Sequence, residues 1–190
     1  MKYTTSIAAL LLGSSMLFGG TYGVDVDHSH LEFKVKHLMI SNVKGQFTKF
    51  EGSFAYDEEK NLLTALEGVV DVNSIDTQNA KRDGHLKSAD FFDAAKYPNM
   101  QLSLVKVTGD TVVANLTIHG VTKEVKMELE SSGAAVKDPW GNIRRGLSLY
   151  TTINRADFGL TWNQLIESGG VMVGDKVKIS IELEGILQKK

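Results

Sequence analysis

A two-residue alternation of apolar and polar side chains runs along most of the chain after residue 23 and is clearest in residues 177–187, VKISIELEGIL. Successive side chains of a β-strand point to opposite faces, so each such segment has one apolar and one polar face. About eight segments of this kind follow one another, with no internal repeat and no domain boundary. Closing them into a barrel removes exposed sheet edges. The sequence therefore predicts an all-β, eight-stranded antiparallel barrel with one short helix.

The first residues resemble a secretory signal peptide. Lys2 precedes an apolar run over residues 7–18, and small residues follow it. The run is shorter than the roughly 20 residues that span a bilayer, so we expect no stable membrane span. We predict a signal peptide over residues 1–23, cleaved between Gly19 and Gly23, and a single domain over residues 24–190. The chain is then expected to be exported, and without cysteine it has no disulfide or cysteine-linked lipid.

The charges of the chain exclude a typical nucleic-acid binder. The chain has 21 basic and 23 acidic residues and a formal net charge of −2. The two signs alternate along the strands, as at Glu124, Lys126 and Glu128, whereas a nucleic-acid binder concentrates basic residues on one face. We interpret these charges as a solvated outer face of the barrel.

Residues 74–99 interrupt the strand pattern. Asp76 or Thr77 is expected to cap a short helix that contains Arg82, and Phe91 and Phe92 lie outside any strand. Long connections in small antiparallel barrels are often functional. We expect this segment to cover one end of the barrel.

The sequence carries no strong catalytic or metal-binding motif. His28 and His30 form an alternate-residue pair, but no cysteine or suitably spaced acid completes a zinc site. A nucleophile elbow, a Walker loop and a dinucleotide fingerprint are all absent from the sequence. We therefore predict no catalytic residues, no metal and no cofactor.

His37 and Arg155 each have a structural and a functional interpretation. His37 is in phase with the apolar side of its strand, so it is either a hydrogen-bonded core residue or a polar anchor near a ligand. Arg155 and Asp157 form an opposite-charge pair that would fix a bend of the chain, unless Arg155 captures an anionic head group.

The interior of the predicted barrel is either filled or hollow. At eight strands a barrel is just wide enough to be packed by side chains or to hold one slender ligand. Gly52, Gly68 and Ala114 occupy inward-facing positions, where a small residue would leave room for a ligand but equally can mark a bend.

Several blocks of sequence together resemble the YceI family. They are 22–37 (YGVDVDHSHLEFKVKH) with 43–47 (VKGQF), 74–77 (SIDT) with 82–93 (RDGHLKSADFFD) and 97–98 (YP), 117–123 (TIHGVTK), and 153–160 (INRADFGL). They follow one another in the family's order over residues 22–187.

The resemblance implies a lipocalin-like periplasmic protein that transports or stores a long apolar lipid, such as a polyisoprenoid or a fatty-acid derivative, in its interior. The expected apolar tunnel is lined by Phe33, Val35, Phe54, Gly68, Val70, Phe91, Phe92, Leu102, Ala114, Leu116, Met127, Leu149, Trp162 and Ile179. The candidates for the polar end are His37, Arg82, His85 and Arg155.

Two other functions stay open at this point. Polar residues near the barrel mouth would suit a lipid-modifying enzyme, and a filled barrel would act through its surface as a stress or interaction protein. The expected partner of the carrier is a long-chain lipid and not a nucleic acid. A homodimer is left open because aromatic residues such as Trp140 lie on loops.

Overall fold

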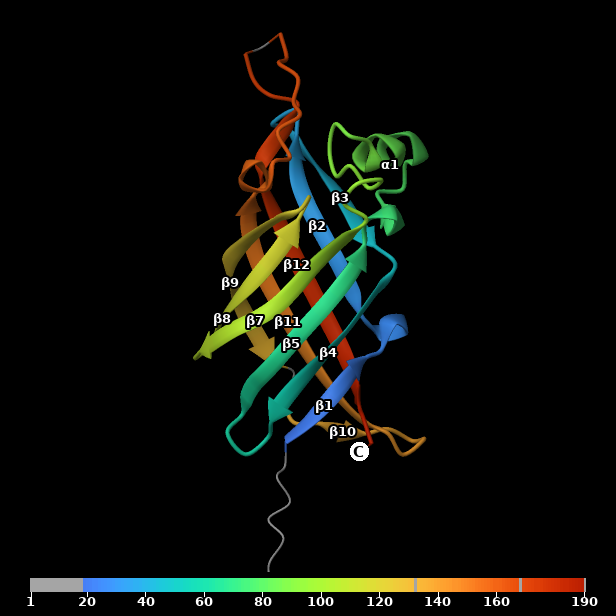
Figure 1. Cartoon of the computed structure of the whole chain (residues 1–190), viewed down its shortest axis with the longest axis vertical. Helices are drawn as coiled ribbons and strands as arrows, with labels where there is room; N and C mark the ends of the chain where they lie inside the picture. Colours follow the sequence, from blue (N-terminus) through green and yellow to red (C-terminus); the bar gives the residue numbers. More distant parts are fainter. Residues whose placement is uncertain (1–18, 132, 168, 190) are drawn as a thin grey trace, which may run out of the picture.

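The computed structural model describes residues 19–131, 133–167 and 169–189. Within them, twelve strands form one antiparallel sheet that closes on itself where β11 (Ile143–Asn154) pairs with β12 (Val173–Leu187). The result is an elongated barrel with the helix α1 (Ala80–Lys87) at one end (Figure 1). None of the helices in these residues is long and apolar enough to cross a membrane.

The barrel wall has eight strands, two of which are interrupted. β1 (Gly19–Val24) and β2 (His30–His37) both pair with β12, one after the other, and are separated by the short 3-10 helix η1 (Val26–His28). The neighbouring wall strand is divided in the same way, into β3 (Ser41–Phe47) and β4 (Phe50–Asp57). The other wall strands are β5 (Leu62–Asp71), β7 (Asn99–Thr108), β8 (Thr111–Ile118), β9 (Val121–Ser131), β11 and β12. The predicted fold class is thus confirmed.

The remaining elements lie at the two ends of the barrel. They are the 3-10 helices η2 (Val72–Ser74) and η3 (Arg155–Phe158) and the two-residue strands β6 (Ile75–Asp76) and β10 (Val136–Lys137). Residues 72–99, which include α1, lie over one end, as expected from the break in the strand pattern (Figure 1).

The cap of α1 differs from the sequence prediction. Asn79 is the N-cap residue, and its side chain accepts a hydrogen bond from the Arg82 amide at 3.0 Å. Thr77 instead donates from both its amide and its hydroxyl to Asp83, and Asp76 accepts from the amide of Gln78. Asp76 and Thr77 therefore shape the turn that precedes the helix.

The predicted signal peptide lies mostly outside the described residues. Its last part, 19–23, is described and forms most of β1. Tyr22 on this strand is only 2% exposed and stacks on Phe54 at a centroid distance of 5.2 Å. The barrel thus uses residues from the expected cleavage region.

A buried arginine closes the end of the barrel opposite α1. The guanidinium of Arg145 lies 3.3 Å from the ring centroid of Tyr56 and donates to Glu58 at 2.6 Å and to the Ser131 hydroxyl at 3.0 Å. The hydroxyl of Tyr22 also donates to Glu58, at 3.1 Å. Above these groups lies a packed apolar cluster, called here the closed-end cluster: Tyr22, Phe54, Tyr56, Leu63, Leu66, Val112, Ala114, Met127, Leu147, Leu149 and Leu183.

We expect Glu58→Gln to lower the free energy of unfolding by about 2 kcal/mol, because it leaves the charge of Arg145 buried without its anion; the loss is about 3–5 kcal/mol for a fully buried pair. Urea unfolding would measure it. Glu59→Gln, at the exposed neighbouring position, is the matched control and should change stability by less than about 0.5 kcal/mol. Equal stability of both variants would contradict this role of Arg145.

Burial, together with the hydrogen bond to Glu58, raises the pKa of Tyr22 from 10.0 to about 12. The folded state therefore favours the neutral phenol. This contribution to stability is complete below pH 10 and is lost as the pH rises towards 12. Urea unfolding at pH 9 and pH 11.5 should show that the free energy of unfolding falls less in Tyr22→Phe than in the unchanged protein. An identical fall in both proteins would argue against this role of Tyr22.

Candidate functional site

An apolar cavity of about 180 Å³ lies inside the barrel between the closed-end cluster and α1. Its wall is formed almost entirely by apolar atoms from strands on all sides. On one side, cross-strand pairs of β2 and β12 face the cavity together, namely Phe33 with Ile179 and Leu31 with Ile181. The alternation seen in the sequence places these side chains on the inner face.

Two glycines create space in the opposite wall. Gly52 on β4 and Gly68 on β5 are direct cross-strand partners, and both line the cavity. A Cβ atom on Gly68 would meet only the Glu51 carbonyl oxygen, at 3.4 Å, whereas one on Gly52 would lie 2.5 Å from the Glu67 carbonyl oxygen. The pair leaves bare backbone where other positions of the wall carry side chains.

A second cavity, of about 400 Å³, continues the first towards solvent at the α1 end. The two cavities share lining residues, among them Phe33, Leu86 and Phe91. We call the second cavity the mouth. Even alone it falls within the range of about 300–1,000 Å³ that is typical of small-molecule sites.

Three rings pack together at the mouth. His85 lies edge-on to Trp162 and to Phe91, at centroid distances of 4.8 and 5.1 Å, and Phe91 lies 5.0 Å from Trp162. The Nε2 atom of His85 is 3.1 Å from an Asp90 carboxylate oxygen. This contact orients the imidazole at the edge of the mouth.

The mouth is basic. Lys36, Lys81 and Arg82 line it together with His37 and His85, and no acidic side chain does so among the described residues. The Nε and Nη2 atoms of Arg82 donate to the Thr77 hydroxyl and carbonyl, each at 2.7 Å. Within residues 19–131, 133–167 and 169–189, Arg82 forms no ion pair. Its charge is thus held in place and available to an anionic or polar group.

The predicted tunnel residues lie at three levels of the barrel. Most of them line the cavity: Phe33, Val35, Gly68, Val70, Phe91, Phe92, Leu102, Leu116 and Ile179. Trp162 lines the mouth. Four others, Phe54, Ala114, Met127 and Leu149, lie in the closed-end cluster and line neither cavity. Ala114 therefore allows close packing and leaves no room for a ligand.

The four candidates for the polar end also separate. His37, Arg82 and His85 meet at the mouth. Arg155 is 4% exposed, and its guanidinium donates to the carbonyls of Leu160 at 2.6 Å, Trp162 at 2.8 Å and Gly174 at 3.1 Å. Further contacts, both at 3.4 Å, go to the Val173 carbonyl and to Asp175. All five N–H donors of Arg155 thus hold the chain around the mouth, and its acidic partner is Asp175 rather than the predicted Asp157.

Lys36 and Lys81 are the basic residues of the mouth that sequence reasoning missed. The alternation along β2 assigns Lys36 to the outer face. However, between the pairs Val173–His37 and Val177–Val35, β12 advances four residues while β2 advances two. This bulge alters the strand end, and Lys36 lines the mouth. Lys81 is exposed on α1, and the hydrophobic periodicity of the sequence does not indicate that it lines a cavity.

A cluster of possible metal ligands at the closed end already contains a cation. Single ligand atoms of Asp25, His28 and Glu184 lie within 4.8 Å of one another. The Nη1 atom of Arg144 donates to Asp25 at 2.7 Å and to Glu184 at 2.6 Å. The hydrogen bond from Arg144 is the largest cause that lowers the pKa of Asp25. The guanidinium takes the place that a metal ion would need.

Comparison with known proteins agrees with the fold and the sequence blocks. The family model of the YceI-like domain matches residues 22–185. A UPF0312 protein of Staphylococcus aureus is 38% identical over 162 residues, which cover 84% of this chain and 94% of the relative.

Two solved structures are also similar. The Campylobacter jejuni YCEI protein has a TM-score of 0.70 and 32% identity, over 81% of this chain and 90% of that one. A polyisoprenoid binding domain from Saccharophagus degradans has a TM-score of 0.64 and 19% identity, over 88% and 98%. With a family match across most of its length and a barrel of the same architecture, the chain belongs to the YceI-like family.

Proposed function

We propose that this protein is a periplasmic carrier that holds a long apolar lipid, a polyisoprenoid or a fatty-acid derivative, inside its barrel. The observation that carries the proposal is the apolar cavity that opens through a basic mouth. The similarity to a domain described as polyisoprenoid binding supports the same class of ligand.

Burial of the lipid tail supplies the affinity. Removing one CH₂ group from water contributes about 0.8 kcal/mol, so a tail of about fifteen carbons gains about 12 kcal/mol. Association costs about 4 kcal/mol or more. Micromolar binding, at about −8 kcal/mol, therefore requires few polar contacts.

The difference between the two ends of the barrel supports one orientation of the lipid. Arg145 and the closed-end cluster block one end of the barrel, so the tail would enter from the mouth and point towards that cluster. The polar end of the lipid would then lie beside Arg82, with His37, His85, Lys36 and Lys81 around it. An oxygen-rich or anionic head group suits these donors.

Binding is favoured over chemical turnover by the surroundings of His85. Its contact with Asp90 resembles the arrangement that orients a catalytic base. Among the described residues, however, no serine or threonine hydroxyl is hydrogen-bonded to the imidazole, so the arrangement holds no side-chain hydroxyl as a nucleophile.

The protein would reach the periplasm through a cleaved signal peptide. The buried Tyr22 on β1 is part of the closed-end cluster, so the mature chain must keep it. Cleavage on the amino-terminal side of Tyr22, near Gly19, preserves the pairing of β1 with β4 and β12.

The first experiment identifies the bound compound. The protein is purified from the periplasm of its exporting host, extracted with organic solvent, and the extract is analysed by mass spectrometry. We expect one long-chain apolar species at near-stoichiometric amount, chemically unchanged after prolonged incubation with the protein. An empty extract, repeated after refolding with prenyl and fatty-acyl lipids, would contradict the carrier function, and conversion of the lipid would favour an enzyme.

Gly68→Leu should weaken binding of a fluorescent long-chain fatty acid about tenfold or more, because the new side chain occupies the cavity that the tail needs. Ala65→Leu adds a large side chain at an exposed position of the same strand and serves as the matched control. Fluorescence titration measures binding, and circular dichroism checks the fold. Unchanged affinity in a folded Gly68→Leu protein would place the ligand elsewhere.

A further inference from the structure

We propose that the mouth end of the barrel docks on the surface of a lipid bilayer through an apolar tip formed by Met39, Ile40 and Leu165. The inference rests on the proposed function, because docking there would bring the cavity next to a source of lipid. It adds a partner, the bilayer surface, and assigns residues that line neither cavity.

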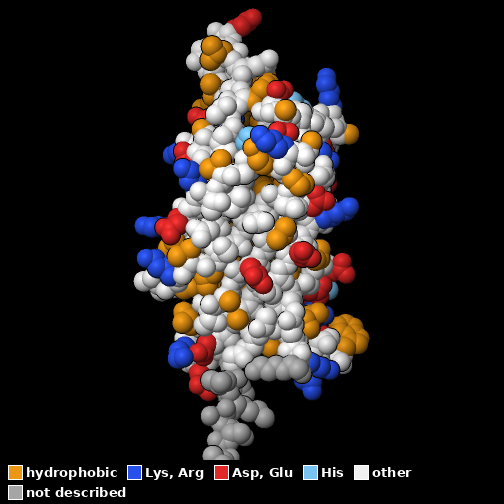
Figure 2. All heavy atoms as spheres, in the orientation of Figure 1, with side chains coloured by type: hydrophobic (Ala, Val, Ile, Leu, Met, Phe, Trp, Pro, Cys, Tyr) orange, Lys and Arg blue, Asp and Glu red, His pale blue; other side chains and the backbone are white. Residues whose placement is uncertain are grey.

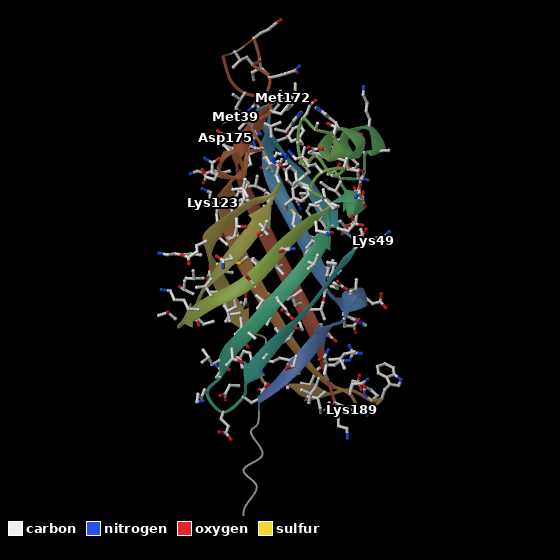
Figure 3. The ribbon with its side chains drawn as sticks, in the orientation of Figure 1. Met39, Lys49, Lys123, Met172, Asp175 and Lys189 are labelled. Atoms are coloured by element: carbon white, nitrogen blue, oxygen red, sulfur yellow. The ribbon has the colours of Figure 1, made fainter. Side chains whose placement is uncertain are left out.

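The three tip residues are strongly exposed. The exposed fractions are 57% for Met39, 81% for Ile40 and 85% for Leu165. They come from two loops, the β2–β3 turn and the loop before β12, that lie at the same end of the barrel (Figure 1). Figure 3 shows Met39 there beside Met172, with Lys189 at the other end. Large apolar side chains that are gathered at one end of a molecule and left in water indicate an interaction surface.

The two loops form one unit. The amide of Leu38 donates to the Met172 carbonyl at 2.8 Å, and a Cβ atom on Gly170 would lie 3.7 Å from the Cγ atom of Met39. Leu165 pairs with Val171 in an isolated β-bridge. The tip is thus tied to the mouth, which Met172 also lines.

The β2–β3 turn has an unusual backbone conformation. Leu38 and Met39 have φ angles of 50° and 63°, in the left-handed region that side chains other than glycine rarely adopt. Bulky apolar residues at such positions are unfavourable in a turn that has only a connecting role. A contact made by their side chains would account for them.

Position and charge together favour a bilayer over a protein partner. The mouth opens beside the tip, so a tail could pass from the bilayer to the cavity without crossing water. Lys36, Lys81 and Arg82 at the mouth would face lipid phosphates when the apolar tip enters the membrane. Figure 2 shows hydrophobic side chains at this end near basic and histidine side chains. Glu167 on the loop before β12 and Asp175 near the start of β12 are exposed acids that reduce this attraction without lining the mouth.

Flotation with vesicles of phosphatidylethanolamine and phosphatidylglycerol tests the proposal. The full chain without its signal peptide should bind, and the combined variant Met39→Ser, Ile40→Ser, Leu165→Ser should bind at least about tenfold more weakly. Trp140→Ser is the matched control: Trp140 is also 81% exposed but lies on the loop that carries β10 at the closed end, so vesicle binding should persist.

Binding of a water-soluble fluorescent fatty acid separates this proposal from the carrier function. We expect the tip variant to retain its affinity for the probe, while Gly68→Leu loses it. Absence of vesicle binding by the unchanged protein, or equal binding by the tip variant, overturns the docking proposal and leaves the carrier function intact. The docking proposal is also overturned if Trp140→Ser loses vesicle binding while the tip variant keeps it. As a second measurement, brominated lipids should quench Trp162 fluorescence in Trp140→Phe, and no quenching would contradict docking by the mouth.

Discussion

The buried guanidinium of Arg145 determines which end of the barrel is closed. It lies 3.3 Å from the centre of the Tyr56 ring and is paired with Glu58, so charge, ring and carboxylate together fill one end of the interior. A buried charge is stable only when it is paired and hydrogen-bonded. The side chains around Arg145 are therefore fixed, and the cavity has access to solvent through the opposite end, where α1 and the loop before β12 form the mouth.

The two-residue period predicted the eight-stranded barrel and the inward face of most strands, but it could not predict depth along the barrel axis. Phe54 and Phe33 have the same phase on their strands, yet one lies in the closed-end cluster and the other lines the cavity. Depth depends on strand stagger, which side-chain alternation does not encode. Arg145 was not singled out from the sequence. Its position in phase with Leu147 and Leu149 was the signal that it points into the barrel. The strand β3 was also missed, because its polar residues obscure the period.

Two arginines at the α1 end, Arg82 and Arg155, have different roles. Arg155 uses all its donors on the surrounding chain, chiefly on backbone carbonyls, and thereby shapes the loop that bears Trp162. Among the described residues, the guanidinium of Arg82 donates only to Thr77, and its charge stays at the mouth. The sequence offered both as candidates, because motif and residue type do not reveal whether the donors of an arginine are already satisfied.

The pairing of β1 with β12 also governs when the barrel can form. Tyr22 lies opposite Leu187, so two segments from opposite ends of the chain must meet before the wall is complete. Such contacts bridge nearly the whole sequence, and contacts of large sequence separation form slowly because a long loop must close first. During synthesis, β1 therefore cannot pair with β12 until Val173–Leu187 has been made. The barrel therefore stays open until β12 has been synthesised, and only then is the apolar cavity enclosed.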